Sequence, residues 1–333
     1  MRVNARSNAG VTPMHETGAV MISGAGGFVG SAILRALREG GKAGSRPVVA
    51  LGTRPADAPR DEIWEQVDLL DSAAVQDVMT RHRPATLIHA AWARSRAGGL
   101  WNAPDNMDWR DASMAMFETF WQAGGRHVVG CGSCAEYAIS DSPCREDATP
   151  IAPESLYGQA KAQLHGMAAA RAAALGGTLA WARIFYLFGP HEAAARLVPS
   201  VIDSLLRGEP ALTGSGLTRR DFALVGDVGR GIAALSRSGG SGAYNVASGE
   251  AIQLRDLIAR IGEIMERPEL IRIGALPDRP DEAPLIAADV TKIARDTGWQ
   301  ARTPLDEALR QTISWRREHA GQGSDDRQRP AQL

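Results

Sequence analysis

The sequence has few cysteines, no long apolar run and almost no excess charge. Its three cysteines are an odd number, which gives no disulfide framework and fits a reducing cytoplasm. No apolar run reaches the ~18 residues that a membrane span requires. The net charge of −1 gives no reason to expect nucleic acid or an anionic membrane as a partner. We therefore expect a cytoplasmic protein that binds neither.

The sequence also lacks a recognisable metal-binding pattern. Its seven histidines, at positions 15, 82, 89, 127, 165, 191 and 319, form no cluster with ligand spacing. Cys131 and Cys134 have C-x-x-C spacing, but a metal or redox role would need further ligands. No metal site is predicted.

The 333 residues suffice for a large core and for two lobes of one compact body. Residues 1–18 are polar and lack the apolar segment of a secretory signal, so we expect a flexible leader, with Met14 as an alternative start. Residues 19–188 are expected to form a dinucleotide-binding core. Residues 189–318 are expected to form mainly a substrate lobe, interleaved with the C-terminal end of the core, and residues 319–333 a disordered tail.

Short apolar runs alternate with helical patterns in the first half of the chain. This alternation predicts a Rossmann-type α/β fold, with a doubly wound parallel sheet and helices on both faces. Strands are expected at residues 19–23, 47–51, 86–91, 127–131 and 178–185, and helices at 31–39, 72–83, 107–123 and 154–175. A smaller α/β lobe is expected at the carboxyl edge of the sheet, with helices at 197–207, 227–236, 254–265, 289–297 and 305–318.

A glycine-rich segment lies between the first expected strand and helix. Gly24, Gly27 and Gly30 fit G-x-x-G-x-x-G, with Phe28 and Val29 before the last glycine. Such glycines allow a tight turn and close approach of the backbone to a pyrophosphate, which lies on the helix N-terminus. The sequence therefore predicts a dinucleotide site; a simple glycine-rich turn is the alternative.

Two residues bear on which nicotinamide cofactor binds. The second strand is followed by Arg54 and not by an acidic residue. An acid there would bind the ribose of NAD, whereas an arginine accommodates the 2′-phosphate of NADP. We expect NADP, with NAD as the alternative, unless Arg54 is a solvated loop residue. Asp68 is a candidate for the adenine amino group or for a helix N-terminus.

Tyr157 and Lys161 are four residues apart in an expected helix. Residues i and i+4 are neighbours on a helix surface, so the ammonium can favour the phenolate and lower the pKa of the phenol. A tyrosine tuned in this way can act as a general acid or base near neutral pH. Alone the pair is a weak signal, because such neighbours are common.

Together these segments resemble the extended short-chain dehydrogenase/reductase family, which includes NDP-sugar epimerases, dehydratases and 4-ketoreductases. The resemblance covers roughly residues 19–315. It is carried by SGAGGFVG (23–30), the segment around Asp68, LIHAAW (87–92), GSCAEY (132–137), YGQAK (157–161), RIFYLFGP (183–190), RRDF with LVGDV (219–228) and a closing GW (298–299).

The resemblance implies roles for particular residues. Ser133 would bind the substrate carbonyl oxygen, Tyr157 would donate the proton, and Lys161 would bind the nicotinamide ribose. For Ser133 the structural alternative is a strand-end cap. Arg220 would grip the nucleotide diphosphate, as would Arg279; the alternative for both is a surface ion pair. The other residues implied beside the cofactor or substrate are Asp68, Leu69, Ala90, Ala91, Cys134, Tyr186 and Arg196.

Several positions depart from the patterns of relatives. Sugar 4,6-dehydratases carry Asp-Glu where this chain has Cys134 and Ala135, and Glu136 is one residue too late and faces the other side of a strand. The Cys and His pair of GDP-fucose-forming enzymes is missing, because Cys134 lies three residues before Tyr137 and Arg196 is near the expected histidine. Tyr186 replaces the usual asparagine.

These departures favour plain reduction of an NDP-4-keto-6-deoxy sugar. An NDP-sugar 4-epimerase with retained NAD is the alternative, since it needs no further residues. A cofactor-binding regulator without turnover is a third reading, which the intact Tyr157 and Lys161 disfavour. A homodimer is expected through a four-helix bundle of helices 107–123 and 154–175. Trp92, Trp101 and Trp109 are expected near the site, at least two of them as core residues.

Overall fold

The computed structural model describes residues 18–39, 46–52, 63–92, 99–278, 280 and 282–320. The expectations for the leader, for the tail beyond residue 320, and for Arg54 and Arg279 lie outside these residues. Across the described ranges, every helix is either too short or too polar to span a bilayer.

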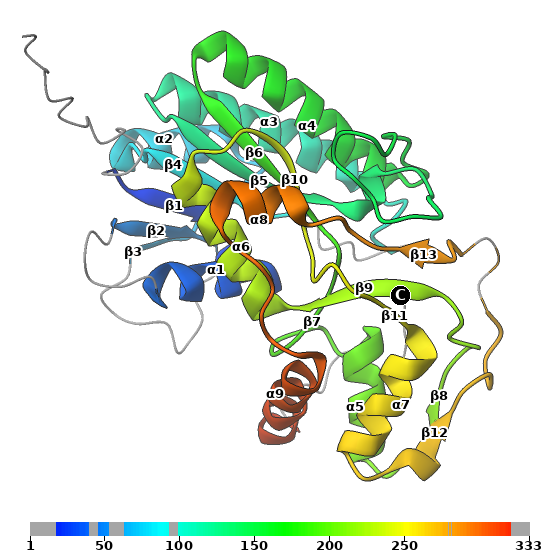
Figure 1. The fold of residues 1–333 in the computed structure, drawn as a ribbon. Helices are drawn as coiled ribbons and strands as arrows, with labels where there is room; N and C mark the ends of the chain where they lie inside the picture. Colours follow the sequence, from blue (N-terminus) through cyan, green and yellow to red (C-terminus); the bar gives the residue numbers. More distant parts are fainter. Residues whose placement is uncertain are drawn as a thin grey trace, which may run out of the picture.

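A parallel sheet of seven strands forms the centre of the molecule (Figure 1). Its order is β10-β6-β5-β4-β1-β2-β3, and each neighbouring pair is parallel. The order reverses between β1 and β4, which is where ligands bind in doubly wound sheets. The predicted Rossmann-type fold is confirmed. The strands are β1 (Val20–Ser23), β2 (Val48–Leu51), β3 (Ile63–Glu65), β4 (Thr86–His89), β5 (His127–Ser133), β6 (Thr178–Ile184) and β10 (Gly242–Val246).

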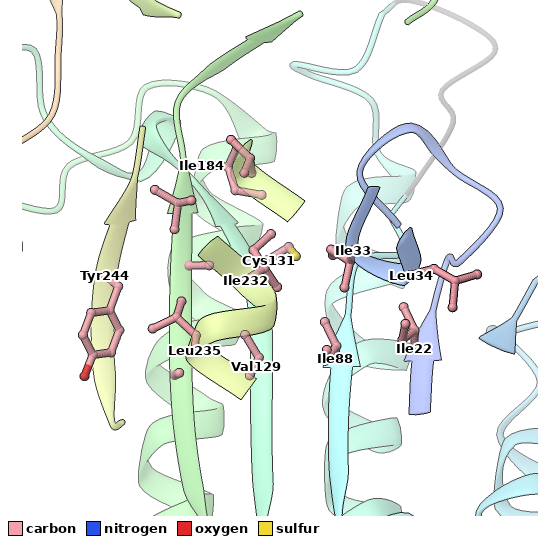
Figure 2. Packing of buried hydrophobic residues seen from close by; sticks show 14 of the residues in the cluster. Ile22, Ile33, Leu34, Ile88, Val129, Cys131, Ile184, Ile232, Leu235 and Tyr244 are labelled. Atoms are coloured by element: carbon pink, nitrogen blue, oxygen red, sulfur yellow. The ribbon is translucent and has the colours of Figure 1, made fainter. Parts of the chain in front are cut away.

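Helices cover both faces of this sheet. On one face lie α1 (Phe28–Glu39), α6 (Val225–Ser238) and α8 (Thr291–Thr297), whose apolar side chains share one buried cluster with the strands. Figure 2 shows Ile33 and Leu34 of α1 and Ile232 and Leu235 of α6 in this cluster. On the other face lie α2 (Ser72–His82), α3 (Asp105–Gln122) and α4 (Leu156–Leu175). This sandwich fixes the strand ends that build the site.

A second, smaller lobe lies beside the carboxyl ends of the strands (Figure 1). In its sheet, β9 pairs with three other strands, β7, β11 and β13, and a further pair joins β8 to β12. Three helices pack on this sheet around a separate apolar core. The elements are β7 (Tyr186–Phe188), α5 (Leu197–Leu206), β8 (Ala211–Leu212), β9 (Arg219–Leu224), β11 (Ala251–Gln253), α7 (Leu254–Ile264), the short 3₁₀ turn η3 (Pro268–Leu270), β12 (Ile271–Arg272), β13 (Leu285–Ile286) and α9 (Leu305–Glu318). Another short 3₁₀ turn, η2 (Cys134–Glu136), follows β5 of the large sheet.

Two differences from the expected elements matter for the site. The fourth expected strand, residues 127–131, extends to Ser133, because its last two residues pair with β6 as well. The expected strand 86–91 ends at His89, so Ala90 and Ala91 belong to the loop that follows it. In addition, β10 joins the large sheet and not the small lobe, although it follows the start of the lobe by more than fifty residues.

Candidate active site

The glycine loop is a compact turn between β1 and α1 with no room for side chains. Gly24 has φ +72°, and Gly27 N–H donates to the Gly24 carbonyl over 2.9 Å. A Cβ added to Gly30 would lie 2.0 Å from the Gly24 carbonyl oxygen. A Cβ added to Gly24 would lie 2.7 Å from Ala91 N. The loop therefore fits a pyrophosphate bound by backbone N–H groups at the N-terminus of α1. The first two residues of this helix are Phe28 and Val29.

A buried histidine braces the strand ends beside this loop. His89 Nδ1 is 2.7 Å from the Ser23 hydroxyl, and its Nε2 is 2.8 Å from the Ser113 hydroxyl. Burial, and then the charge of Lys161, lower the pKa of His89 to about 3. His89 is thus a neutral core residue that ties β1 to β4. Next to it, Ala90 N–H donates to the Ser23 carbonyl over 3.1 Å, which fixes the start of the following loop.

Ser133, Tyr157 and Lys161 come together where β5 meets α4. Ser133 is the last residue of β5, and Tyr157 and Lys161 lie in the first two turns of α4. Ser155 caps this helix by accepting a hydrogen bond from Gly158 N. A Cβ on Gly158 would lie 2.2 Å from the Ala135 carbonyl oxygen, so only glycine lets α4 approach the turn that follows Ser133.

Lys161 is held below the surface by a carbonyl and an indole. Its Nζ donates to the Cys131 carbonyl over 2.8 Å and lies 3.5 Å from the centre of the Trp92 ring. Only 3% of the residue is exposed. Burial lowers the pKa of Lys161 to about 7, against the opposing effects of Cys131 and Glu136. In the protein without cofactor, Lys161 therefore changes between its protonated and its neutral form near neutral pH.

Tyr157 lies between two tryptophans. The rings of Trp92 and Trp101 meet its ring edge to face, with centroids 6.1 and 5.7 Å away, and Tyr157 N–H donates to the Trp101 carbonyl. Burial raises the pKa of Tyr157, while hydrogen bonding with Ser133 lowers it. The expected lowering of this pKa by Lys161 does not dominate, because the ammonium binds Cys131 and lies 5.9 Å from the phenol ring.

The depressed pKa of Lys161 should make stability depend on pH. Between about pH 7 and its ordinary value of 10.5, the unfolded chain holds a proton here that the folded chain lacks. The contribution of this group to the free energy of unfolding therefore rises with pH in that window, by up to about 1.4 kcal/mol per pH unit. In urea denaturation of the cofactor-free protein, the free energy of unfolding of the wild type should increase relative to that of Lys161→Met as pH rises from neutrality. If the free energies of unfolding of the two proteins changed with pH in the same way, the pKa of Lys161 would not be lowered.

In the second lobe, Arg220 is buried against Tyr186. Its guanidinium lies 5.6 Å from the centre of the Tyr186 ring, and its Nη2 donates to Glu282 over 2.8 Å. Its Nε has no hydrogen-bond partner among the described residues. The Arg220 charge also lowers the pKa of Cys134, although burial dominates and raises that pKa to about 12. Arg220, Tyr186 and Cys134 thus share one region beside Ser133.

Other predicted residues are placed differently. Arg196 is exposed at the start of α5, where its nearest acid is Glu192 at 4.0 Å. Asp68 is exposed and accepts a hydrogen bond from Leu70 N over 3.0 Å, while its neighbour Leu69 is buried. The roles of all three toward cofactor or substrate stay predictions. As expected, two of the three tryptophans, Trp92 and Trp109, pack against the core.

Cys131, Cys134 and Cys144 are free thiols. Within the described part of the chain, no three His, Cys, Asp or Glu side chains are grouped so that they could hold a metal ion.

Sequence reasoning missed residues that surround the candidate site residues Ser133 and Tyr157. The expectation that Glu136 lies on a strand is wrong. It lies in the turn η2, where it is fully buried under Ser133. Asn102 accepts a hydrogen bond from Leu156 N at the start of α4. The only available signal was their nearness in sequence to GSCAEY and to Trp101, and it does not specify these contacts.

A glycine loop at the switch point of a doubly wound sheet, next to a Ser, Tyr and Lys cluster, defines an enzyme of the extended short-chain dehydrogenase/reductase class. Residues 20–247 match the model of the NAD dependent epimerase/dehydratase family. The chain belongs to that family.

Known relatives cover nearly the whole chain. The dTDP-glucose 4,6-dehydratase of Neisseria gonorrhoeae is 26% identical over 345 residues, with 89% of this chain and 94% of that protein covered. The structure of MoeE5 in complex with UDP-glucose and NAD is 29% identical, with a TM-score of 0.77 and coverage of 91% and 100%. The UDP-glucose 4-epimerase of Thermotoga maritima has a TM-score of 0.81 at 20% identity, covering 91% and 99%, and so shares the fold.

Proposed function

We propose that this protein is an NAD(P)-dependent 4-ketoreductase of an NDP-4-keto-6-deoxy sugar. One observation carries the proposal. Ser133 at the end of β5 lies beside Tyr157 and Lys161 of α4, which supports oxidation or reduction at C4. The two positions that hold acids in sugar 4,6-dehydratases are here Cys134 and Ala135. A thiol with a pKa near 12 and a methyl group cannot perform the proton transfers of water elimination.

The residues supply the proton and the orientation for reduction. The Ser133 hydroxyl donates a hydrogen bond to the C4 carbonyl oxygen, and the Tyr157 phenol gives this oxygen its proton as the alcohol forms. When bound, the nicotinamide cofactor supplies the hydride that the C4 carbon accepts. The Lys161 ammonium stabilises the phenolate that is left, and solvent then restores the proton.

Further parts of the proposal concern binding. Arg220 offers a buried guanidinium for the substrate diphosphate, and its Nε has no hydrogen-bond partner among the described residues. Arginine binds such groups through paired N–H groups. Arg279 is proposed as a second diphosphate ligand and Arg54 as the residue that favours NADP. We also propose a homodimer formed through α3 and α4, which already pack against each other within one chain.

A 4-epimerase is the second candidate. It is supported by the similarity to MoeE5, which is 29% identical and was solved with NAD and with UDP-glucose or UDP-glucuronic acid, sugars that carry an alcohol and not a ketone at C4. The same Ser133, Tyr157 and Lys161 would oxidise C4 and then reduce its other face.

The two candidates differ in what they consume. We expect the purified protein to oxidise added NADPH or NADH in step with loss of a dTDP-4-keto-6-deoxy sugar, and NMR of the product to show one new C4 alcohol. UDP-glucose and UDP-glucuronic acid incubated without added reductant serve as the matched test of epimerisation. Their conversion, together with NAD retained through purification, would replace the reductase by the epimerase. Conversion of dTDP-glucose itself to its 4-keto-6-deoxy product would contradict both.

A further inference from the structure

A fully buried carboxylate lies directly under the proposed catalytic serine. Glu136 Oε1 accepts hydrogen bonds from Ser133 N at 2.8 Å and from Trp181 Nε1 at 2.9 Å. Its Oε2 accepts from Arg183 Nε at 2.8 Å and from the same indole at 3.1 Å. Glu136 has 0% of its surface exposed. Both oxygens are thus occupied by donors from β5 and β6.

Arg183 is almost as deeply buried as Glu136, although its Nη1 has no hydrogen-bond partner among the described residues. It is 3% exposed, its guanidinium lies 4.5 Å from the centre of the Tyr137 ring, and its Nη2 is 3.5 Å from His165 Nδ1. His165 in turn stacks on Trp181, with ring centroids 5.2 Å apart. Removing two charges from water is costly, and a buried ion pair often contributes no more stability than an apolar pair. Its geometry, and not its energy, distinguishes this pair.

The backbone of β5 leaves space for this network. A Cβ on Gly132 would lie 2.2 Å from Trp181 Nε1 and 2.4 Å from Glu136 Oε1. A Cβ on Gly130 would lie 2.4 Å from the Trp181 ring. Because Gly130 and Gly132 have no side chains, the Trp181 indole and the Glu136 carboxylate can pack directly against the backbone of β5.

The network also determines how the serine hydroxyl can bond. Glu136 and Ser133 form a reciprocal capping box, in which Ser133 Oγ accepts from Ala135 N over 3.2 Å while Glu136 accepts from Ser133 N. With its oxygen accepting from the turn, the hydroxyl has its proton left to donate. Gly158 packs on the same turn through the Ala135 carbonyl, which sets the distance to Tyr157.

We propose that Glu136, anchored by Arg183 and Trp181, is a positioning residue that fixes the Ser133 backbone so that its hydroxyl faces Tyr157 and the substrate carbonyl. Glu136 touches neither substrate nor cofactor and acts through Ser133. The inference rests on the proposed function, because it takes Ser133 and Tyr157 as the catalytic groups.

The test is a double-mutant cycle between Glu136→Gln and Ser133→Ala. A glutamine has one acceptor oxygen and cannot serve both Ser133 N and Arg183 Nε. We expect Glu136→Gln to lower kcat by about 10–100-fold, the cost of a misplaced catalytic group, with the KM for cofactor unchanged. In the Ser133→Ala background the same substitution should cost little more, because the group it positions is gone. Independent, additive losses would overturn the proposal.

A second readout does not depend on turnover. Hydrogen exchange of the Ser133 amide, followed by NMR with ¹⁵N-serine, should be faster in Glu136→Gln than in the wild type. Glu146→Gln is the matched control, since Glu146 also accepts a backbone N–H, from Asn245, but does not touch Ser133. Unchanged exchange would overturn the inference even if the enzyme acts on a different sugar. Inactivity toward every sugar, with faster exchange, would count against the proposed function alone.

If Glu136→Gln does not fold, Trp181→Phe takes its place. It removes the indole N–H that Glu136 binds and keeps most of the ring. We expect a smaller fall in kcat and a smaller acceleration of Ser133 exchange, in the same directions. Wild-type values for both in a folded Trp181→Phe protein would overturn the proposal.

Discussion

Tyr157→Phe is expected to lower kcat by about 10²–10⁴-fold, the usual contribution of a positioned proton donor. The phenol is the group between Ser133 and Lys161 that can give a proton to a substrate oxygen. Because the ring packs edge to face on Trp92 and Trp101, phenylalanine can keep those contacts. Steady-state turnover, the melting temperature and a fluorescence titration with cofactor would together measure the loss, and the last two should change little.

Tyr244→Phe is the matched control for this substitution. Tyr244 lies on β10, and its hydroxyl donates to Asp296 on α8 over 3.2 Å, away from the site. Its loss should cost about 0.5–1.5 kcal/mol of stability, as for a single hydrogen bond, and leave kcat unchanged. If Tyr157→Phe turned over like the wild type, the proton donor would have to be another group.

Gly30→Ala is expected to weaken cofactor binding by about 10–100-fold. The new methyl group would lie 2.0 Å from the Gly24 carbonyl oxygen, so the loop or the first turn of α1 must move. Overpacking of this kind costs about 1–3 kcal/mol, and each 1.4 kcal/mol is a factor of ten in affinity. Titration with NADPH and NADH measures the change in dissociation constant directly.

The control for Gly30→Ala is Gly166→Ala in α4. A Cβ at Gly166 would meet no atom within 4 Å, and alanine is the better helix former by about 0.5–1 kcal/mol. This variant should be equally or more stable, with wild-type cofactor affinity. An unchanged dissociation constant in Gly30→Ala would mean that the loop is not the cofactor cradle.

The large sheet could be predicted from sequence because its strands are short apolar runs between helical patterns. The strands that were missed lack that pattern. β10 is framed by Gly242 and includes Asn245, and β3 has only three residues, of which Ile63 is exposed. The residues of these two strands do not by themselves predict a strand. Each forms because it pairs with a neighbour, β10 with β6 and β3 with β2, and local sequence does not reveal this pairing.

The candidate site divides in the same way. Tyr157 and Lys161 could be proposed from their four-residue spacing, and Ser133 from the resemblance of its segment to the family's motif. The environment of Glu136 could not, since its partners Trp181 and Arg183 are more than forty residues away and meet it only across neighbouring strands. The direction of the Tyr157 pKa shift was also out of reach, because burial raises this pKa while the Cys131 carbonyl and the Trp92 ring hold the Lys161 ammonium.

The chain passes repeatedly between the two lobes. It leaves the large sheet from β6 to β7, returns from β9 to α6, leaves again from β10 to β11, returns from β13 to α8 and ends in α9 (Figure 1). The second lobe therefore cannot be exchanged between relatives at a single junction. A chimera with another sugar specificity would need a splice at each crossing, and recombination within this family should favour changes in loops and single side chains over transfer of the whole lobe.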